Sequence, residues 1–285
     1  MKTKHHLLWV VLAGLLLFTT CREKDLDMTV LHKTLYEGAA MSEITVKDAW
    51  DVVILQDAEA SYVELEYSAF LEDYLKVQLN GSALFIGFTR HLYFPSNTVM
   101  NVTIHTPMVH KLSFSDAVFA ALDNLNLETD LTLELEDAAS CRGGHFKGNA
   151  DLKLSDASTC VELYIEGADC KVTLEDASVL KGCLNVSGDL TMKLEDASRL
   201  TEYWGVINRA TVEVSDASNL NMATSWINRM HIDVDDASEA TVNVTESLEG
   251  KVHDASKLYY SGNPVLNVDC DETSILQQVE YPDPD

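Results

Sequence analysis

The sequence is poor in basic residues, and its longest apolar run is only twelve residues, 7–18. Twenty Lys and Arg stand against forty-six Asp and Glu, which gives a net charge of −26. A surface this acidic repels phosphate backbones and excludes nucleic acid as a partner. The hydrophobic fraction of 46% is ordinary for a folded chain and excludes wholesale disorder.

The apolar run lies at the N-terminus and predicts export. Lys2 and Lys4 precede it, and it is shorter than the roughly 20 residues that span a bilayer, so we expect residues 1–20 to be a signal peptide. Cys21 follows and resembles the lipobox cysteine of bacterial lipoproteins, although Thr20 stands where Gly, Ala or Ser is usual. The resemblance implies lipidation of Cys21 and a bacterial outer-membrane or cell-surface location, with contact to the membrane through acyl chains only. A plain secretory signal is the alternative.

A repeat of about twenty residues decides the predicted architecture. The pair Asp-Ala recurs at intervals of 21, 19, 20, 20, 20, 20 and 18 residues. The marked aspartates are Asp116, Asp137, Asp156, Asp176, Asp196, Asp216, Asp236 and Asp254.

The residues before each mark alternate strictly between apolar and polar, as in 171–175 and 191–195, which is typical of β-strands. No proline occurs between Pro107 and Pro264. A twenty-residue unit cannot bury its own apolar face, but stacked copies share one core. The sequence therefore predicts an all-β fold, a parallel β-solenoid of about eight rungs. A propeller would need blades of about 40 residues, and a sandwich of hairpins would show Asn-Gly or Asp-Gly turns, which the repeats lack.

We expect one domain over residues 36–281, joined to the anchor by a polar tether, 21–35. Within the domain, residues 36–115 are expected to form divergent N-terminal strands that cap the stack, because the unpaired N–H and C=O groups of an open rung can pair with another chain. Residues 116–265 carry the Asp-Ala repeats, and residues 266–281 are expected to cap the other end.

The cysteines and histidines form no recognisable metal or redox motif. There is no Cys-x-x-Cys, no His-x-His and no His-Glu-x-x-His, so no metal site and no cofactor is predicted. A nucleophile motif and a phosphate-binding loop are also missing, so we expect no enzymatic activity. Cys141 and Cys160 occupy the same place in adjacent units. They are either small core residues or a disulfide pair.

Equivalent aspartates should stack in a column along one edge. Their structural role would be to form the repeat corners, because Asp tolerates left-handed backbone conformations and its carboxylate can accept backbone N–H bonds. Their functional role would be a ladder of weak Ca²⁺ sites. Neighbouring carboxylates about 5 Å apart repel by roughly 1 kcal/mol in water, which either role must offset.

Aromatic residues cluster in the later units, at Tyr164, Tyr203, Trp204 and Trp226. One interpretation is core packing or edge covering. The other is a shallow stacking strip formed by Tyr203, Trp204 and Trp226 for a glycan or a surface-protein ligand.

With these units laid out, the chain resembles the bacterial GIN-domain family of auto-transporter adhesin heads. The resemblance rests on residues 44–54, on rungs of the form Leu-x-Leu-Ser-Asp156-Ala-Ser, and on the closing segment 260–264. Asp and Ala stand where the family commonly has Gly and Ser. The resemblance implies a non-catalytic cell-surface lipoprotein that acts in adhesion or recognition. The alternatives are a purely structural envelope lipoprotein and a cation-stabilised polysaccharide-binding solenoid.

Overall fold

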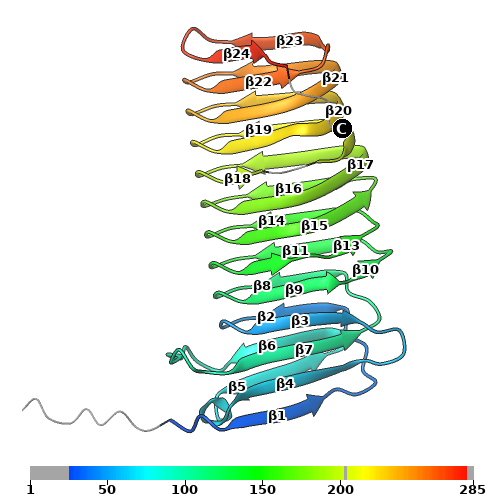
Figure 1. The fold of residues 1–285 in the computed structure, drawn as a ribbon, viewed down its shortest axis with the longest axis vertical. Helices are drawn as coiled ribbons and strands as arrows, with labels where there is room; N and C mark the ends of the chain where they lie inside the picture. Colours follow the sequence, from blue (N-terminus) through cyan, green and yellow to red (C-terminus); the bar gives the residue numbers. More distant parts are fainter. Residues whose placement is uncertain (1–25, 202–203, 281–285) are drawn as a thin grey trace, which may run out of the picture.

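The computed structural model describes residues 26–201 and 204–280, which form a tall column of stacked β-strands (Figure 1). Successive rungs pair in parallel with in-register partners, as between β14 (Ala150–Leu154) and β16 (Cys170–Leu174). The predicted fold, an all-β parallel solenoid of about eight rungs, is confirmed.

Each regular rung consists of a first strand, a tight turn and a second strand that bends back toward the next rung. Long strands continue from the second strand of one rung into the first strand of the next. The remaining strands of the column are β8 (Lys111–Phe114), β9 (Phe119–Asn124), β10 (Asn126–Leu127), β11 (Leu131–Leu135), β12 (Ser140–Arg142), β13 (His145–Phe146), β15 (Thr159–Gly167), β17 (Val179–Leu194), β18 (Arg199–Leu200), β19 (Val206–Val214), β20 (Asn219–Val234), β21 (Glu239–Val252), β22 (Lys257–Ser261), β23 (Val265–Cys270) and β24 (Ile275–Gln278).

The core lies between the strand walls and is built from columns of in-register apolar residues. Parallel pairing places equivalent side chains directly above one another, so each is covered by the rungs above and below. One such column is at most 1% exposed and contains Leu133, Leu152, Val172, Met192, Val212 and Ile232.

Cys141 and Cys160 are in-register partners on β12 and β15, and both are buried in the core. Their Sγ atoms lie 2.8 Å apart as two free thiols. The contact with Cys160, together with burial, raises the pKa of the Cys141 thiol well above its ordinary value. The pair therefore belongs to the core column that continues as Leu180 and Leu200.

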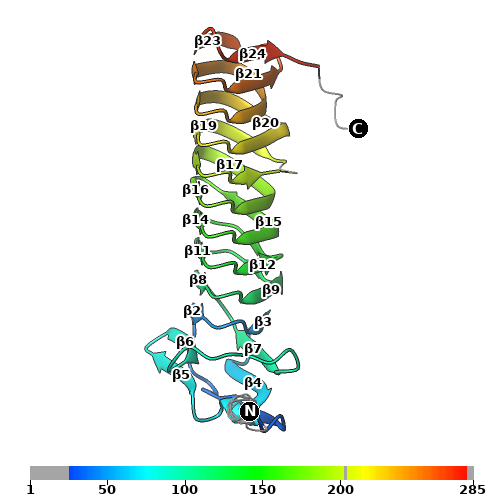
Figure 2. The same cartoon turned by 90° about the vertical axis from the view of Figure 1, so that its left-hand side faces the viewer.

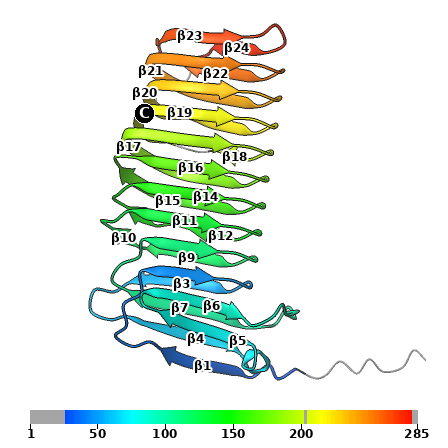
Figure 3. The same ribbon diagram turned by 180° about the vertical axis from the view of Figure 1, so that it is seen from behind.

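The Asp-Ala pairs form a row of tight turns along one edge of the column, at the left in Figure 1 and at the right in Figure 3. All sixteen residues of the eight predicted pairs have φ between 52° and 63°. Positive φ at both central residues is the pattern of a type I′ turn, for which Asn-Gly and Asp-Gly are the usual sequences. Here Asp-Ala adopts this conformation. The turn closes by a bond such as Ser158 N–H to Ser155 O, 3.2 Å.

Hydrogen bonds between rungs stabilise this edge. In the first seven of the eight predicted turns the alanine N–H donates to the main-chain oxygen of the next aspartate, as from Ala157 to Asp176 at 2.8 Å; in the last, Ala255 N–H donates to Thr273 Oγ1. Six of the eight alanines are followed by a buried serine. The hydroxyls of Ser218, Ser238 and Ser256 each accept the backbone N–H of the equivalent serine one rung earlier, as Ser218 Oγ does from Ser198 N–H at 3.2 Å. These bonds offset the cost of placing alanine in the left-handed region, about 1–2 kcal/mol per residue.

A further Asp-Ala turn, Asp48–Ala49, lies outside the predicted series. It joins β2 (Glu43–Val46) to β3 (Asp51–Gln56), which pair in parallel with β8 and β9 as a regular rung. Ala49 N–H donates to Asp116 O at 2.8 Å, as in the later turns. This turn falls outside the twenty-residue period because the next Asp-Ala turn with positive φ, at Asp116, follows 68 residues later (from 48 to 116).

The residues inserted between these two turns end the stack. They first add one more rung below β2 and β3, and then switch to antiparallel strands that cover its edge (Figure 2). This change of direction closes the N-terminal end of the column. The inserted elements are β6 (Ala83–Phe88) and β7 (Met100–Thr106) in the added rung, then β5 (Leu75–Asn80), β4 (Tyr62–Ser68) and the short 3-10 helix η1 (Ala69–Leu71). The strand β1 (Val30–Leu35) precedes both turns in the chain and pairs antiparallel with β4.

The opposite end continues the parallel pattern to its last rung. β23 pairs with β21 and β24 pairs with β22, both in parallel. Val265 on this rung is 73% exposed. The two ends of the column therefore differ: antiparallel strands cover the first, and the second ends on a parallel rung.

Candidate ligand-binding face

Four large apolar side chains lie exposed on the segments that follow the turns at Asp156, Asp196 and Asp216. Their exposed fractions are 41% for Tyr164, 51% for Trp204, 59% for Val206 and 47% for Trp226. We call these four residues the aromatic strip. The neighbours that point inward, such as Ile207 and Ile227, are fully buried. The strip is therefore the outer surface of strands whose inner surface is core.

The register of the strands brings the strip together. Tyr164 is the partner of Cys183, and Cys183 is bridged to Trp204, so the two aromatic rings lie two rungs apart in one column. Two rungs span about 10 Å, yet the ring centroids are only 6.0 Å apart, edge to face. The rings therefore lean toward each other across the intervening rung. Val206 and Trp226 are partners in the next column.

Cys183 lies on this outer face beneath the two rings. Because in-register residues of parallel neighbours point the same way, its side chain faces outward with those of Tyr164 and Trp204. It is nevertheless only 2% exposed. Burial, with a smaller contribution from the nearby Glu166 carboxylate, raises the pKa of the Cys183 thiol to about 11.

The predicted stacking residues are only partly brought together. Trp204 and Trp226 lie on the same face, but in neighbouring columns. Tyr203 lies outside the described residues. Val206 was not among the residues predicted from the sequence, and no stacking role was predicted for Tyr164. Side chains alternate between the two faces of a strand. Because Ile207 and Ile227 are buried, residues at odd offsets from them, namely Trp204, Val206 and Trp226, could have been placed on the outer face.

Beside the strip, each rung bends at a corner that carries a ladder of polar side chains. The side-chain oxygen at this corner accepts the backbone N–H of the next rung's corner residue, at 2.8, 2.9 and 3.1 Å in three successive rungs. The corner residues in chain order are Asp130, Asn149, Asp169 and Asp189.

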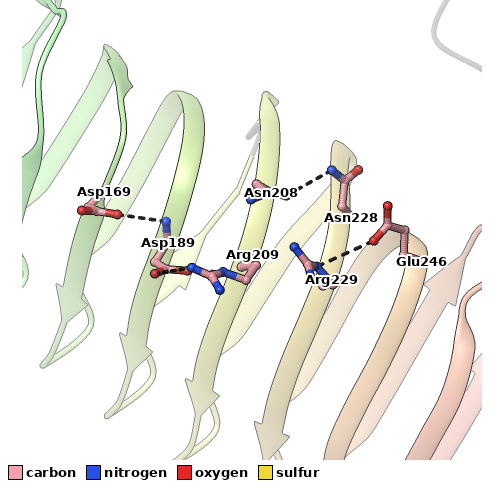
Figure 4. Close-up of polar contacts among 7 residues, drawn as sticks. All are labelled: Asp169, Asp189, Asn208, Arg209, Asn228, Arg229 and Glu246. Atoms are coloured by element: carbon pink, nitrogen blue, oxygen red, sulfur yellow. Dashed lines mark hydrogen bonds and ion pairs between the residues drawn. The ribbon is translucent and has the colours of Figure 1, made fainter.

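The ladder changes character at the next two rungs, where arginine occupies the corner (Figure 4). Arg209 pairs with Asp189 through two hydrogen bonds, 2.5 and 2.8 Å. Arg229 makes one looser ion pair with Glu246 at 3.7 Å. Next to them Asn228 Nδ2 donates to Asn208 Oδ1 at 3.4 Å.

Two open hollows flank this corner. One, of about 500 Å³, is lined by both arginines, by Thr191, Thr211 and His231, and by the acidic residues Asp189 and Glu249. The other, of about 570 Å³, lies on the side of the strip and is lined by Val206, with Asn208 and Asn228. The change at the corner therefore coincides with surface relief that a small polar ligand can enter.

The turn aspartates lie at the opposite edge, and all eight are exposed. Asp116 accepts a hydrogen bond from Ser115 Oγ at 3.1 Å. In the described part of the chain, the carboxylates of the other seven accept none, and the turns are held through main-chain oxygens. Over residues 26–201 and 204–280 no three His, Cys, Asp or Glu side chains form a group that could hold a metal ion.

Cys21, the predicted lipidation site, lies outside the described residues. Within the described ranges, no helix is long and apolar enough to cross a membrane.

The stacked rungs and the exposed strip define the class of the molecule as a parallel β-solenoid with one distinctive outer face. The chain belongs to the family described as "Putative auto-transporter adhesin, head GIN domain", which matches residues 40–264. The predicted resemblance to the GIN-domain family is thereby confirmed. No curated protein matches the sequence.

Solved structures share the fold at low sequence identity. A "putative lipid binding protein" from Parabacteroides distasonis is 12% identical with a TM-score of 0.63, covering 88% of this chain and 98% of its own. A "putative adhesin" from Parabacteroides merdae is 13% identical with a TM-score of 0.58, covering 88% and 97%. Another "putative adhesin", from Parabacteroides distasonis, is 16% identical with a TM-score of 0.56, covering 89% and 98%.

Proposed function

We propose that the protein is a non-catalytic recognition module of the bacterial cell surface that binds its ligand on the aromatic strip. The observation that carries the proposal is the exposure of Trp204 and Trp226 on a column whose other apolar residues are largely buried. Leaving apolar area in water costs about 25 cal/mol per Å², so folding alone favours burying these rings. Exposed aromatic clusters mark binding surfaces, and the family description as an adhesin head supports the same role.

Glycans and protein surfaces are the ligand classes that fit the strip. A tryptophan or tyrosine ring presents a flat apolar surface with a polar edge, and it loses little conformational entropy when it binds. The amide pair Asn208 and Asn228 offers hydrogen bonds beside the rings. The strip therefore combines stacking surface with polar groups, as recognition of a partly polar ligand requires.

Lipid attachment at Cys21 is the anchor that fits this role. The first described strand, β1, begins at Val30 and belongs to the closed end of the column. An acyl chain on Cys21 would tether the column by this closed end, with residues 21–29 as spacer; the predicted tether of 21–35 is too long because residues 30–35 pair with β4. Labelling of the intact protein by a radioactive fatty acid tests the anchor, and labelling that persists in Cys21→Ser would contradict it.

The function is tested with purified protein on arrays of glycans and matrix proteins. Trp204→Ala and Trp226→Ala should abolish binding and leave the circular dichroism spectrum unchanged. Tyr93→Ala is the matched control, because Tyr93 is 88% exposed but lies far along the chain from the strip, in the segment between β6 and β7. Binding that survives both tryptophan variants would refute the proposal, and so would loss of the β-sheet spectrum, because the rings would then be structural.

A further inference from the structure

The two arginines at the corner coincide with the exposed tryptophans. Arg209 follows Trp204 in one rung, and Arg229 follows Trp226 in the next. In the four preceding rungs the corner carries aspartate or asparagine, and in the first three of them its side-chain oxygen accepts the backbone N–H of the next corner residue. The fold is therefore satisfied by Asp or Asn at this corner, and a guanidinium cannot accept the same backbone bond. The architecture alone gives no reason for arginine here.

The two guanidinium groups differ in how far they are satisfied. Arg209 is bound by both carboxylate oxygens of Asp189 in a bidentate pair. Arg229 is 51% exposed, contacts Glu246 only at 3.7 Å, and donates no hydrogen bond to any residue in the described part of the chain. A guanidinium has five N–H donors in a fork that matches a carboxylate. Arg229 (Figure 4) therefore presents free donors at the hollow of about 500 Å³ that it lines.

The free donors lie within reach of the strip. Trp226 and Arg229 are three residues apart in β20, on either side of the bend, so their Cα atoms are at most about 10 Å apart. Asn228 lies between them and Thr211 lines the hollow beyond. A stacking ring, an amide and a guanidinium in this order match the apolar face, the hydroxyls and the carboxylate of an acidic sugar.

We propose that the ligand of this face is a glycan with isolated carboxylate groups, and that Arg229 binds the carboxylate while Trp226 stacks on the adjoining sugar ring. The inference rests on the proposed function and names its ligand class. The net charge of −26 narrows the ligand class further. A polyanion would meet repulsion from the whole surface, whereas a single carboxylate is screened from distant charges beyond about 8 Å at physiological salt.

The test measures binding to glycans that end in a carboxylate-bearing sugar and to the same glycans with the carboxylate reduced to an alcohol. Carboxylate reduction and Arg229→Gln should each weaken binding about tenfold, the size expected for a charge-assisted bond. The two changes together should cost no more than either alone. Lys171→Gln is the matched control, because Lys171 lies on the same side of the column, three rungs away and outside the hollow.

A second variant tests the inference by gain of binding. Asp189→Asn removes the carboxylate that occupies Arg209 and should strengthen binding of the acidic glycan while leaving its reduced counterpart unchanged. Equal binding of acidic and reduced glycans, with loss on Trp226→Ala, would overturn this inference and leave the proposed function standing. Tight binding to heparin or to phosphatidylserine vesicles instead would also overturn it. Absence of binding to every glycan and matrix protein would overturn both.

Discussion

The two edges of each rung follow opposite rules. At the turn edge, Asp-Ala recurs with the same backbone angles in every regular rung, and φ stays within 52–63° over the eight predicted pairs. At the opposite corner, the residue changes from Asp or Asn to Arg209 and Arg229, and the strand before it exposes Trp204 and Trp226. Regularity in a repeat protein thus marks what every rung needs in order to stack. Departure from the repeat marks where the molecule can recognise something else.

The contrast also settles which part of the turn aspartate matters to the fold. The backbone of Asp176 accepts from Ala157 N–H at 2.8 Å, whereas its carboxylate is exposed. Exposed neighbouring carboxylates repel by only about 1 kcal/mol in water and less in salt. The aspartate is therefore suited to its place by tolerance of positive φ rather than by its charge.

The largest effect on stability should come from replacing a turn alanine with a residue that disfavours positive φ. Ala197 has φ of 62°, and a β-branched residue is strongly disfavoured there. We expect Ala197→Val to lower the free energy of unfolding by about 3 kcal/mol, measured by urea denaturation. Ala197→Gly, which takes the same angles without strain, should stay within about 1 kcal/mol of the natural chain. Equal losses for Val and Gly would contradict the role assigned to the turn.

A somewhat smaller effect is expected on the alkylation rate of Cys183, which Trp204 covers. Burial holds the pKa of this thiol at about 11, so at pH 8 almost none of it is the reactive thiolate. Trp204→Ala should lower that pKa toward its ordinary value and speed alkylation of Cys183 on the order of a hundredfold, since each pKa unit changes the thiolate fraction tenfold. Peptide mass spectrometry identifies the alkylated residue.

The control for this prediction is Trp226→Ala. Trp226 lies in the neighbouring column, paired with Val206 rather than above Cys183. Its removal should leave Cys183 protected. If both variants expose the thiol equally, the rings are not the cover that the structure describes, and the strip is packed differently.

Much of the regular column could be predicted because its physics is local. The Asp-Ala period locates the turns, and alternation identifies inward residues such as Val172 and Met192, each 1% exposed. Asp48 was missed because the inserted residues break the period. The antiparallel strands β4 and β5 could not be placed, since their partners are fixed by long-range pairing that no local pattern encodes.

The candidate site was less predictable, for two reasons. The corner ladder has the same twenty-residue period as the turns, from Asp169 through Asp189 to Arg209. The change from aspartate to arginine can be recognised in the sequence only when the position of the bend is known. The bend itself follows from packing. The meeting of Tyr164 and Trp204 over Cys183 depends on side chains that reach across two rungs, which spacing along the chain does not reveal.

The smallest effect provides the most direct test of the contrast between the two edges. The triple variant Asp176→Asn, Asp196→Asn, Asp216→Asn keeps residues that tolerate positive φ and removes three charges from the turn edge. On one glycan and matrix-protein array it should bind as the natural chain does, whereas the double variant Trp204→Ala, Trp226→Ala should not bind. Loss of binding in the aspartate variant, with binding retained in the tryptophan variant, would contradict the account.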